Sequence, residues 1–378
     1  MANLKIGIVC YPTLGGSGVV ATELGKSLAL LGNEVHFITA GHPARLSGYD
    51  QRVYLHKVVT GEYPLFQQYA PYSLSLAVKI REVAEQYELD LVHVHYAIPH
   101  AASAFLAKEM LKPRSLPTVT TLHGTDITLV GMMPSYYEIT RFSIEKSDAV
   151  TAVSEFLRRE TVREFRIERP IEVIHNFVDT ELFRVRDHDC AASSRLSPHG
   201  ERVLMHISNF RKVKNLPVVL AVFNEVQKHL PARLALVGDG PERESTERQA
   251  EEMGISDRVD FLGDQESVAD ILPAADVFLL PSQHESFGLA ALEAMACGVP
   301  VVGSRIGGLP EVIVHEETGY LCDPNDVQCM TTIVLALLRD EKLRRTIGRA
   351  ARARAESEFN RDRVVARYVD AYRRLVAS

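Results

Sequence analysis

The sequence predicts an α/β protein of two doubly wound domains, each a parallel sheet covered by helices on both faces. Short β-branched runs alternate with helix-length amphipathic stretches, stop at a polar stretch over residues 186–200, and then start again. A chain of 378 residues is also long for a single core. We therefore expect domains at 1–180 and 200–360 that face each other across a cleft, with a helix at about 361–378 packing back on the first.

Each predicted strand is a short aliphatic or β-branched run. In the first half the expected strands are residues 5–9, 34–39, 91–95, 118–122, 149–153 and 171–174. In the second half they are residues 203–207, 233–237, 259–262, 277–280 and 299–302. Residues 19–31, 287–296 and 361–376 are expected helices, and residues 186–200 are expected to form a linker or surface loop.

Composition narrows the class of protein. A net charge of −7 gives no basic excess for binding nucleic acid. The five cysteines are scattered and never form a C-x-x-C pair, so the sequence suggests neither a disulfide framework nor a zinc ribbon. The apolar segment at residues 4–10 is too short for a signal peptide or a membrane span. A cytoplasmic protein without an integral membrane segment is expected.

Two glutamates, Glu285 and Glu293, follow the predicted strand at residues 277–280. Ligands of open α/β sheets bind at the carboxyl ends of the strands. The free amides at the start of the next helix suit a diphosphate, and the carboxylates suit sugar hydroxyls. A phosphorylated sugar satisfies both demands. The alternative is that both glutamates are solvated charges on an exposed loop and helix.

A glycine loop, Gly15-Gly16-Ser17-Gly18, follows the first strand and precedes a helix. Such a loop permits positive φ and close approach of the backbone to a phosphate, although a purely structural turn is the alternative. The chain lacks both G-x-G-x-x-G and an acid at the end of the second strand, which disfavours a dinucleotide dehydrogenase. It also lacks G-x-x-x-x-G-K-[ST], which disfavours a P-loop phosphotransferase.

Other candidate groups also follow strands. Arg211, Lys212 and Lys214 come after residues 203–207 and could clamp a diphosphate, or could be solvated surface. His123 comes after residues 118–122 and can donate to a sugar hydroxyl or a phosphate. Two metal alternatives are disfavoured: the histidine group lacks carboxylate partners, and the Asp-x-Asp triplet lies away from every strand end. Their residues are His93, His95 and His100, and Asp187-His188-Asp189.

Together these segments resemble the retaining glycosyltransferases of family 4, which have the GT-B fold of two facing Rossmann-like domains. The resemblance covers nearly the whole chain. It is carried by the glycine loop, Lys214 and residues 238–242 and 281–311. More narrowly, residues 10–24, 123–126 and 175–179 are similar to the members of this family that open bacillithiol biosynthesis.

This resemblance implies transfer of N-acetylglucosamine from UDP-GlcNAc to the hydroxyl of L-malate, with the α configuration retained and without a metal or cofactor. Glu293 would hold the ribose hydroxyls, Glu285 the sugar hydroxyls, and Lys214 would neutralise the leaving diphosphate. Asn209 stands where many members have arginine, and Arg211 would supply that charge. The remaining donor groups would be Gly16, Ser17, His123 and Ser286, with the amides of Phe287, Gly288 and Leu289 on the phosphates. The expected malate pocket consists of Ser17, Tyr96, Thr121 and Arg141.

Other functions stay open at this point. A related transferase could use inositol phosphate, a lipid or a growing glycan as acceptor. A non-catalytic nucleotide-sugar-binding protein would keep the diphosphate loop without releasing UDP. A phosphorylase or an epimerase of the same architecture is also conceivable. The partners expected are UDP-GlcNAc and L-malate and, in a homodimer, a second copy of the chain.

Overall fold

The computed structural model describes residues 3–13, 15–46, 51–61, 71–186, 191–265 and 267–377, without the side chains of residues 191–193. The chain divides into two compact units. The first unit is Met1–Asn176 with Asp362–Ser378, and the second is Phe177–Arg361. The chain therefore leaves the first unit once and returns to it.

The first unit contains a seven-stranded sheet in the order β3-β2-β1-β4-β5-β6-β7, and every strand pair in it is parallel. Its strands are β1 (Lys5–Val9), β2 (Glu34–Thr39), β3 (Val53–Lys57), β4 (Leu91–His95), β5 (Thr118–Leu122), β6 (Ala149–Ala152) and β7 (Glu172–Val173). Its helices are α1 (Gly16–Leu30), α2 (Tyr72–Tyr87), η1 (Ala97–Ala101), α3 (Ala102–Met110), η2 (Thr125–Leu129), α4 (Pro134–Lys146), α5 (Glu155–Phe165) and α13 (Arg361–Val376).

The second unit contains a six-stranded parallel sheet in the order β10-β9-β8-β11-β12-β13. Its strands are β8 (Arg202–Ile207), β9 (Ala232–Val237), β10 (Val259–Gly263), β11 (Val277–Leu280), β12 (Val301–Ser304) and β13 (Tyr320–Cys322). Its helices are α6 (Ala191–Leu196), α7 (Leu216–Gln227), α8 (Arg243–Glu252), α9 (Leu289–Ala296), α10 (Leu309–Val312), α11 (Val327–Arg339) and α12 (Glu341–Glu358). Short 3-10 turns are η3 (Lys212–Lys214), η4 (Ser256–Arg258), η5 (Val268–Asp270) and η6 (Leu272–Ala274).

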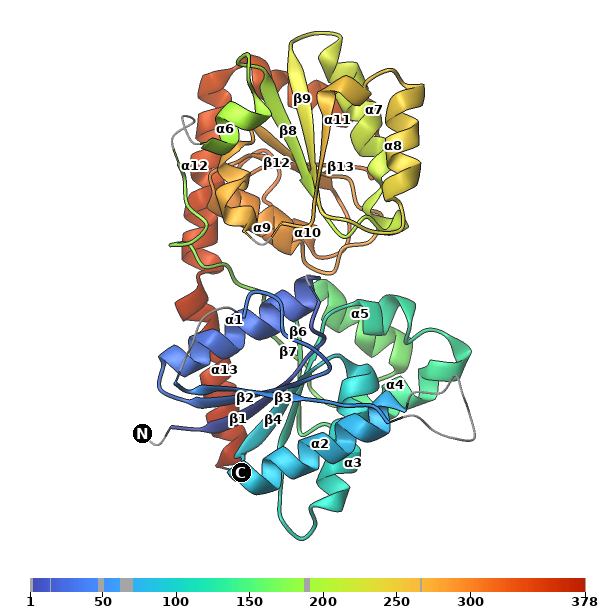
Figure 1. The fold of residues 1–378 in the computed structure, drawn as a ribbon, viewed down its shortest axis with the longest axis vertical. Helices are drawn as coiled ribbons and strands as arrows, with labels where there is room; N and C mark the ends of the chain where they lie inside the picture. Colours follow the sequence, from blue (N-terminus) through green and yellow to red (C-terminus); the bar gives the residue numbers. More distant parts are fainter. Residues whose placement is uncertain are drawn as a thin grey trace. The chain divides into compact units, whose positions relative to one another are not determined.

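The two faces of the first sheet are chemically different. Val92 and Val94 of β4 belong to an apolar core with α2 and α3. Because side chains alternate along a strand, His93 and His95 lie on the opposite face. There the Nδ1 atom of His93 lies 2.6 Å from the hydroxyl of Tyr372 in α13. In Figure 1, α1 lies across the sheet from α2. The C-terminal helix thus covers the part of this face that carries His93.

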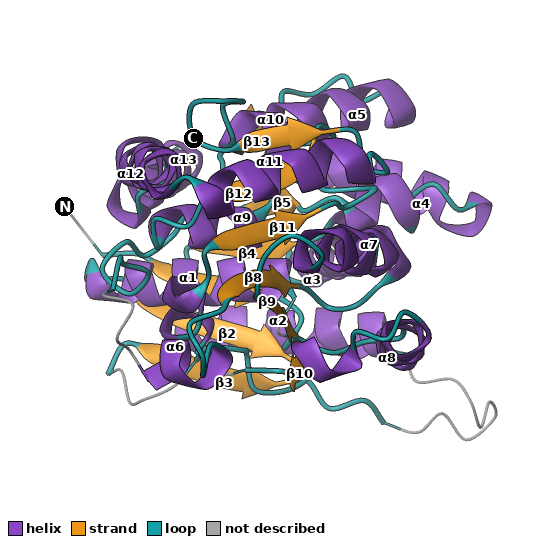
Figure 2. Cartoon of the chain, turned by 90° about the horizontal axis from the view of Figure 1, so that it is seen from above, coloured by secondary structure: helices purple, strands orange, loops and turns teal. Residues whose placement is uncertain are grey.

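The second sheet has apolar residues on both faces. One face, with Leu204, Leu236 and Leu279, packs on α7 and α11, whereas α9 lies against η6 and α12. In Figure 2, orange strands lie between purple helices in each unit. The continuous burial of β11 explains its uninterrupted apolar sequence, because strands covered on both faces need no polar alternation.

Every strand that the sequence predicts is present, with ends shifted by at most two residues. Two edge strands were not predicted. β3 is largely exposed, and β13 has three residues, so neither produces a strong apolar run. Three local predictions were wrong: α1 begins at Gly16 rather than 19, α9 begins at Leu289 rather than 287, and α6 forms inside the predicted linker.

The sequence suggests no disulfide framework, and the structure contains a single bonded pair among the described residues, Cys322 and Cys329. β13 ends at Cys322 and the first turn of α11 contains Cys329, so the contact comes from the fold and leaves no short motif in the sequence. Among the described residues, every helix is too short or too polar to span a bilayer.

Candidate functional site

Loops at the carboxyl ends of the second sheet are locked together by main-chain contacts. The amide of Gln283 donates to the carbonyl of Val213 (2.8 Å), and the amide of Gly308 donates to the carbonyl of Glu285 (2.9 Å). Gly307 has φ +57°, and a Cβ atom there would lie 1.8 Å from the carbonyl oxygen of Glu285. Only glycine fits this position. The loop after β12 therefore supports the glutamate loop after β11.

An ion pair joins two of the predicted site residues. Nζ of Lys214, in η3 after β8, lies 2.7 Å from Oε2 of Glu285, in the loop after β11. The side chains are 20% and 14% exposed, so the pair is sheltered but still accessible. A partly desolvated pair of this kind interacts more strongly than a surface pair. The structure thus brings together the cation and one of the carboxylates that the sequence predicts.

The start of α9 differs from the predicted one. Gly288 precedes the helix with φ +102°, in the left-handed region, and a Cβ atom there would meet Leu309 at 2.5 Å. The side chain of Phe287 is buried and contacts Phe359. Leu292 donates to the carbonyl of Gly288 as the first full helical bond. The amides of the first turn therefore follow Gly288, at the same sheet edge as Glu285.

Glu293 lies in the middle of α9 and is only 5% exposed. Ser286 is half-buried, whereas Asn209 and Arg211 are exposed in the loop after β8. Asn209 and Ser286 thus lie on the loops after β8 and β11, and Glu293 lies on the helix that follows the second of these loops. It gives Arg211 an open position rather than a contact with Glu285.

A buried histidine orders the loop that carries Lys214, and the sequence argument missed it. His206 in β8 is fully buried, with Nδ1 2.8 Å from the carbonyl of Leu279 and Nε2 2.8 Å from the hydroxyl of Ser208. Burial lowers its pKa to about 4, so the ring is neutral. Nδ1 must donate to the carbonyl, which leaves Nε2 to accept from Ser208. In the sequence, its position two residues before Ser208 is the local feature that could have indicated this contact.

In the first unit, the glycine loop is the first turn of α1. Gly15 has φ −67°, so the positive φ that a glycine permits is not used there. Gly18 is needed for a different reason: a Cβ atom would lie 2.5 Å from the carbonyl oxygen of Thr13 and 2.8 Å from that of Tyr11. Glycine is therefore required at residue 18 by the close approach of the preceding loop to the helix, and not by a left-handed backbone conformation. Gly16 is exposed on this first turn.

Ser17 and Tyr96 lie together as the sequence predicts for an acceptor pocket. The hydroxyl of Ser17 donates to the hydroxyl of Tyr96 at 2.7 Å. Tyr96 has φ +91°, which is strained for a residue with a side chain. Its amide donates to the carbonyl of Thr121. Strain of this kind gathers at functional sites, and no sequence pattern reveals it.

Thr121 and Arg141 do not join this pair in the predicted way. The hydroxyl of Thr121 is fully buried and lies 2.7 Å from Nε2 of His93 and 2.6 Å from the hydroxyl of Thr151. It faces the interior because strand residues alternate, and its hydroxyl is engaged by side chains of the neighbouring strands. Arg141 is exposed on α4.

His123 follows β5 and contacts a second histidine. Its Nε2 lies 2.8 Å from Nδ1 of His95. Burial, followed by the charge of His100, lowers the pKa of His123 to about 3. The ring is therefore neutral at pH 7 and can serve in a hydrogen bond.

Asp126, which the sequence argument also missed, fixes the turn after β5. Its carboxylate accepts from the amides of His123 (3.3 Å), Gly124 (3.0 Å) and Ala97 (2.9 Å). Burial raises its pKa to about 6, although these amides oppose the rise. An aspartate just after a strand is a known turn signal and could have been noticed.

The metal alternatives receive no support. The described residues hold no group of three or more histidine, cysteine or acidic side chains placed to bind a metal. His93 and His95 share a face, but their Nδ1 atoms are already engaged with Tyr372 and His123. The triplet at residues 187–189 lies outside the described residues.

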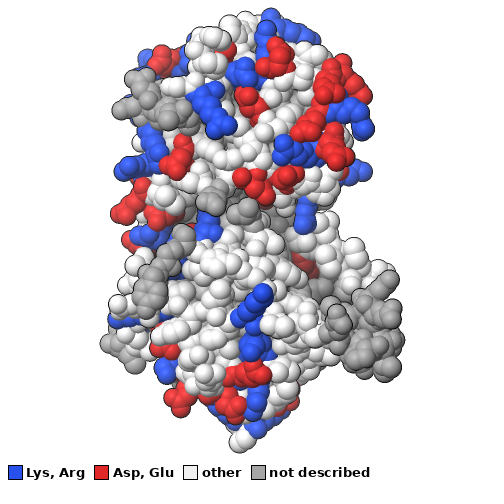
Figure 3. Space-filling view, in the orientation of Figure 1, with Lys and Arg blue, Asp and Glu red and all other residues white. Residues whose placement is uncertain are grey.

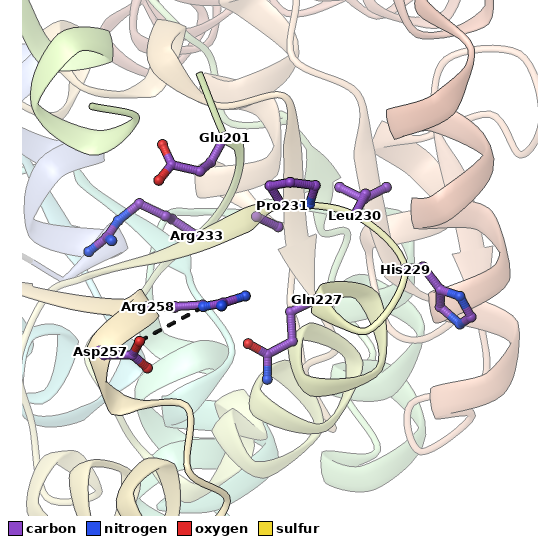
Figure 4. Close-up of a pocket in the computed structure, with 9 residues that line it drawn as sticks. Glu201, Gln227, His229, Leu230, Pro231, Arg233, Asp257 and Arg258 are labelled. Atoms are coloured by element: carbon purple, nitrogen blue, oxygen red, sulfur yellow. Dashed lines mark ion pairs between the residues drawn. The ribbon is translucent and has the colours of Figure 1, made fainter. Parts of the chain in front are cut away.

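A surface cavity of about 540 Å³ lies elsewhere in the second unit. Figure 4 shows Arg233, Arg258 and His229 around it, at the amino ends of β9 and β10. That is the sheet edge opposite to the Lys214 and Glu285 loops, and ligands of parallel sheets bind at the carboxyl edge. Figure 3 shows acidic and basic side chains interspersed on the face in view, as expected from the modest net charge.

Comparison with known proteins gives the family. A model described as Glycosyltransferase Family 4 matches residues 14–182, and one described as Glycosyl transferases group 1 matches residues 191–354. N-acetyl-alpha-D-glucosaminyl L-malate synthase of Bacillus anthracis is 48% identical over 370 residues, which cover 98% of this chain and 97% of that protein. A GDP-mannose-dependent alpha-(1-6)-phosphatidylinositol monomannoside mannosyltransferase of Mycolicibacterium smegmatis is 30% identical over 74% of this chain and 75% of its own length.

Solved structures give the same fold. Sucrose-phosphate synthase from Thermosynechococcus elongatus has a TM-score of 0.83 at 22% identity, over 99% of this chain and 100% of that chain. Anabaena HepE in complex with UDP and glucose has a TM-score of 0.83 at 20% identity, over 98% and 99% of the two chains. The chain belongs to the family 4 glycosyltransferases and has their GT-B fold of two Rossmann-like domains.

Proposed function

We propose that this enzyme transfers N-acetylglucosamine from UDP-GlcNAc to the hydroxyl of L-malate, with retention of the α configuration, as the first step of bacillithiol biosynthesis. The observation that carries the proposal is the near full-length identity of 48% with the N-acetyl-alpha-D-glucosaminyl L-malate synthase of Bacillus anthracis. The Lys214–Glu285 pair at the carboxyl edge of the second sheet supplies chemistry that fits a nucleotide-sugar donor.

The second unit would bind the donor. Lys214 supplies a positive charge for the diphosphate, Glu285 accepts from sugar hydroxyls, and Glu293 accepts from the ribose. The amides that follow Gly288 at the start of α9 add donors for phosphate oxygens. In this proposal the diphosphate replaces Glu285 as the partner of Lys214, and the carboxylate of Glu285 is then free to accept hydrogen bonds from the sugar.

The reaction needs no protein nucleophile. The bond between sugar C1 and the diphosphate oxygen breaks, and a bond from C1 to the malate hydroxyl oxygen forms on the same face. The hydroxyl proton passes to the departing diphosphate. The protein then positions the reactants and stabilises the charge that develops on the diphosphate, which is the role of Lys214. No metal or cofactor takes part in the proposed steps.

The first unit would bind malate and orient the sugar. Ser17 and Tyr96 offer hydroxyl groups 2.7 Å apart, next to the first turn of α1. Malate is a dicarboxylate, so hydroxyl and amide donors suit it, and Arg141 is the proposed cation. His123 would contact the donor sugar. The homodimer and the cytoplasmic location stay predictions.

The test is a transfer assay with the purified protein and UDP-GlcNAc. UDP release is measured with L-malate and with succinate, which has both carboxylates but no hydroxyl, and products are weighed by mass spectrometry. We expect one N-acetylhexosamine added to malate and no product with succinate. Product with inositol phosphate but not with malate would favour the related transferase, and UDP-GlcNAc binding without any turnover would favour a non-catalytic binder.

A further inference from the structure

A pair of histidine rings lies behind the candidate site of the first unit. His95 ends β4 and is fully buried, and His123 directly follows the neighbouring strand β5. Nδ1 of His95 and Nε2 of His123 lie 2.8 Å apart, and the two rings meet edge to edge, with centroids 5.0 Å apart and 27° between their planes. This distance is a hydrogen bond, so one ring donates and the other accepts.

The surroundings keep both rings uncharged. Burial lowers the pKa of both, and the nearby rings of His93, His100 and the partner histidine lower that of His95 further. Two neutral imidazoles share one proton in their hydrogen bond, and each ring carries one N–H. Only two arrangements of the protons are therefore available.

In the first arrangement His95 donates from Nδ1 and its buried Nε2 keeps a bare lone pair. In the second His123 donates from Nε2, and His95 must carry its own proton on Nε2. That atom is buried, and it finds no hydrogen-bond partner among the described residues. Orphaned buried N–H groups are rarer and costlier than unsatisfied acceptors. The first arrangement therefore has the lower free energy.

We infer that His95 is a positioning residue that donates its Nδ1–H to Nε2 of His123, and so keeps the proton of His123 on Nδ1. The carbonyl of His95 contacts Nδ1 of His100, and the carboxylate of Asp126 holds the amide of His123, so both ends of the pair are anchored. The consequence for the reaction rests on the proposed function. His123 would present an N–H donor to a sugar oxygen and could not act there as a base.

The position of the proton can be read without any substrate. Histidine labelled with ¹⁵N in the ring distinguishes protonated from bare nitrogens by NMR, and the His123 signals are assigned by their loss in His123→Asn. We expect the proton on Nδ1 of His123 in the parent protein. In His95→Leu the donor is gone, and the His123 proton should move to Nε2 or be shared. A parent protein with the proton on Nε2 overturns the inference.

Kinetics then test the role in transfer. His95→Leu should lower kcat about tenfold, the loss of one aligned hydrogen bond. His95→Asn can place an amide N–H near the position of Nδ1 and should recover most of that loss. His56→Leu is the matched control, because His36 and His56 form an equally short pair of 2.8 Å between β2 and the edge strand β3.

Equal kcat in the parent, His95→Leu and His56→Leu would overturn the positioning role, and so would a His95→Asn protein as slow as His95→Leu. If the parent transfers no sugar to malate, the proposed function fails, while the NMR measurement still decides where the proton lies.

Discussion

The two units build their candidate sites from different chemistry. In the second unit an ion pair, Lys214–Glu285, lies among loops whose close approach depends on glycines such as Gly307. In the first unit the corresponding sheet edge holds neutral histidines, tyrosines and hydroxyls, joined by hydrogen bonds such as His95 to His123. The Lys214–Glu285 ion pair thus lies in one unit, and the hydrogen-bonded histidine pair lies in the other. This division suits a reaction in which one substrate carries the diphosphate.

Mild acid should produce the largest difference between the two units, because it should lower the stability of the first unit more. Burial lowers the pKa of His93 and His123 to about 3 and that of His100 to about 4. Each ring binds its proton more readily in the unfolded chain, so stability is present above the unfolded pKa of about 6.5 and is lost as the pH falls below it. At pH 5 each of these three histidines should lower the free energy of unfolding by about 2 kcal/mol, and together they should lower it by several kcal/mol.

In the second unit, burial lowers the pKa of His206 to about 4. In the first unit Asp126 opposes the trend, since its pKa is raised to about 6 and acid relieves its burial. One carboxyl does not offset several rings. Hydrogen exchange at pH 7 and pH 5 should show a larger loss of protection in the first unit, and equal losses in both units would contradict this expectation.

Loss of the cation in the second unit should have the largest effect on catalysis. Lys214→Ala removes the charge that meets the diphosphate, so kcat should fall about 100-fold or more, with a smaller change in KM for the donor. Lys212→Ala is the matched control, because Lys212 is exposed in the same turn. Similar kcat values for both variants would contradict the proposal that Lys214 stabilises the charge on the diphosphate.

Close packing of the loops is tested with two glycines. Gly307→Ala places a Cβ atom 1.8 Å from the carbonyl of Glu285 and should cost about 3 kcal/mol of unfolding free energy. Gly254→Ala has a similar φ of +68° but open space around it, so it should cost only about 1 kcal/mol. Denaturant unfolding measures both, and equal costs would mean that backbone strain alone matters.

A substitution of Glu293 should weaken binding of the donor without slowing the transfer step. Glu293→Gln keeps the shape of this buried side chain but removes its charge, so KM for UDP-GlcNAc should rise about tenfold with little change in kcat. Glu251→Gln, exposed on α8, should change neither value. A fall in kcat at constant KM would instead place Glu293 in the transfer step.

The smallest effect is expected from the contact between His93 of the first sheet and Tyr372 of α13. Tyr372→Phe removes the hydroxyl that lies 2.6 Å from Nδ1 of His93 and should cost about 1 kcal/mol. Tyr136→Phe, on the exposed side of α4, should cost nothing measurable. Thermal unfolding compares the two, and an unchanged midpoint for Tyr372→Phe would mean that the bond contributes little.

The sequence predicts the architecture well because parallel strands and their helices have strong local periodicity. β1, β2, β4, β5 and β11 have the predicted bounds. The edge strands β3 and β13 were missed because an exposed or very short strand lacks a continuous apolar run. Residues 186–200 lack strong periodicity too, and the short helix α6 at residues 191–196 escaped prediction.

The site of the second unit was more predictable than that of the first. Lys214 and Glu285 each lie directly after a predicted strand, and parallel strands bring their carboxyl ends together. The histidine network of the first unit depends on contacts between distant segments, such as His93 with Tyr372. The left-handed backbone of Tyr96 and the buried position of Thr121 also arise from tertiary structure. Periodicity in the sequence carries none of this information.

The return of α13 to the first unit has a consequence for biosynthesis. The sheet strands of that unit all precede residue 177, but the helix that covers His93 follows the whole second unit. On the ribosome, the face of the early sheet that carries His93 stays uncovered by α13 until nearly two hundred further residues have been made, which takes about 10 to 40 s at ordinary elongation rates. A nascent chain halted before α13 should therefore expose this face to chaperones, whereas one halted after it should not.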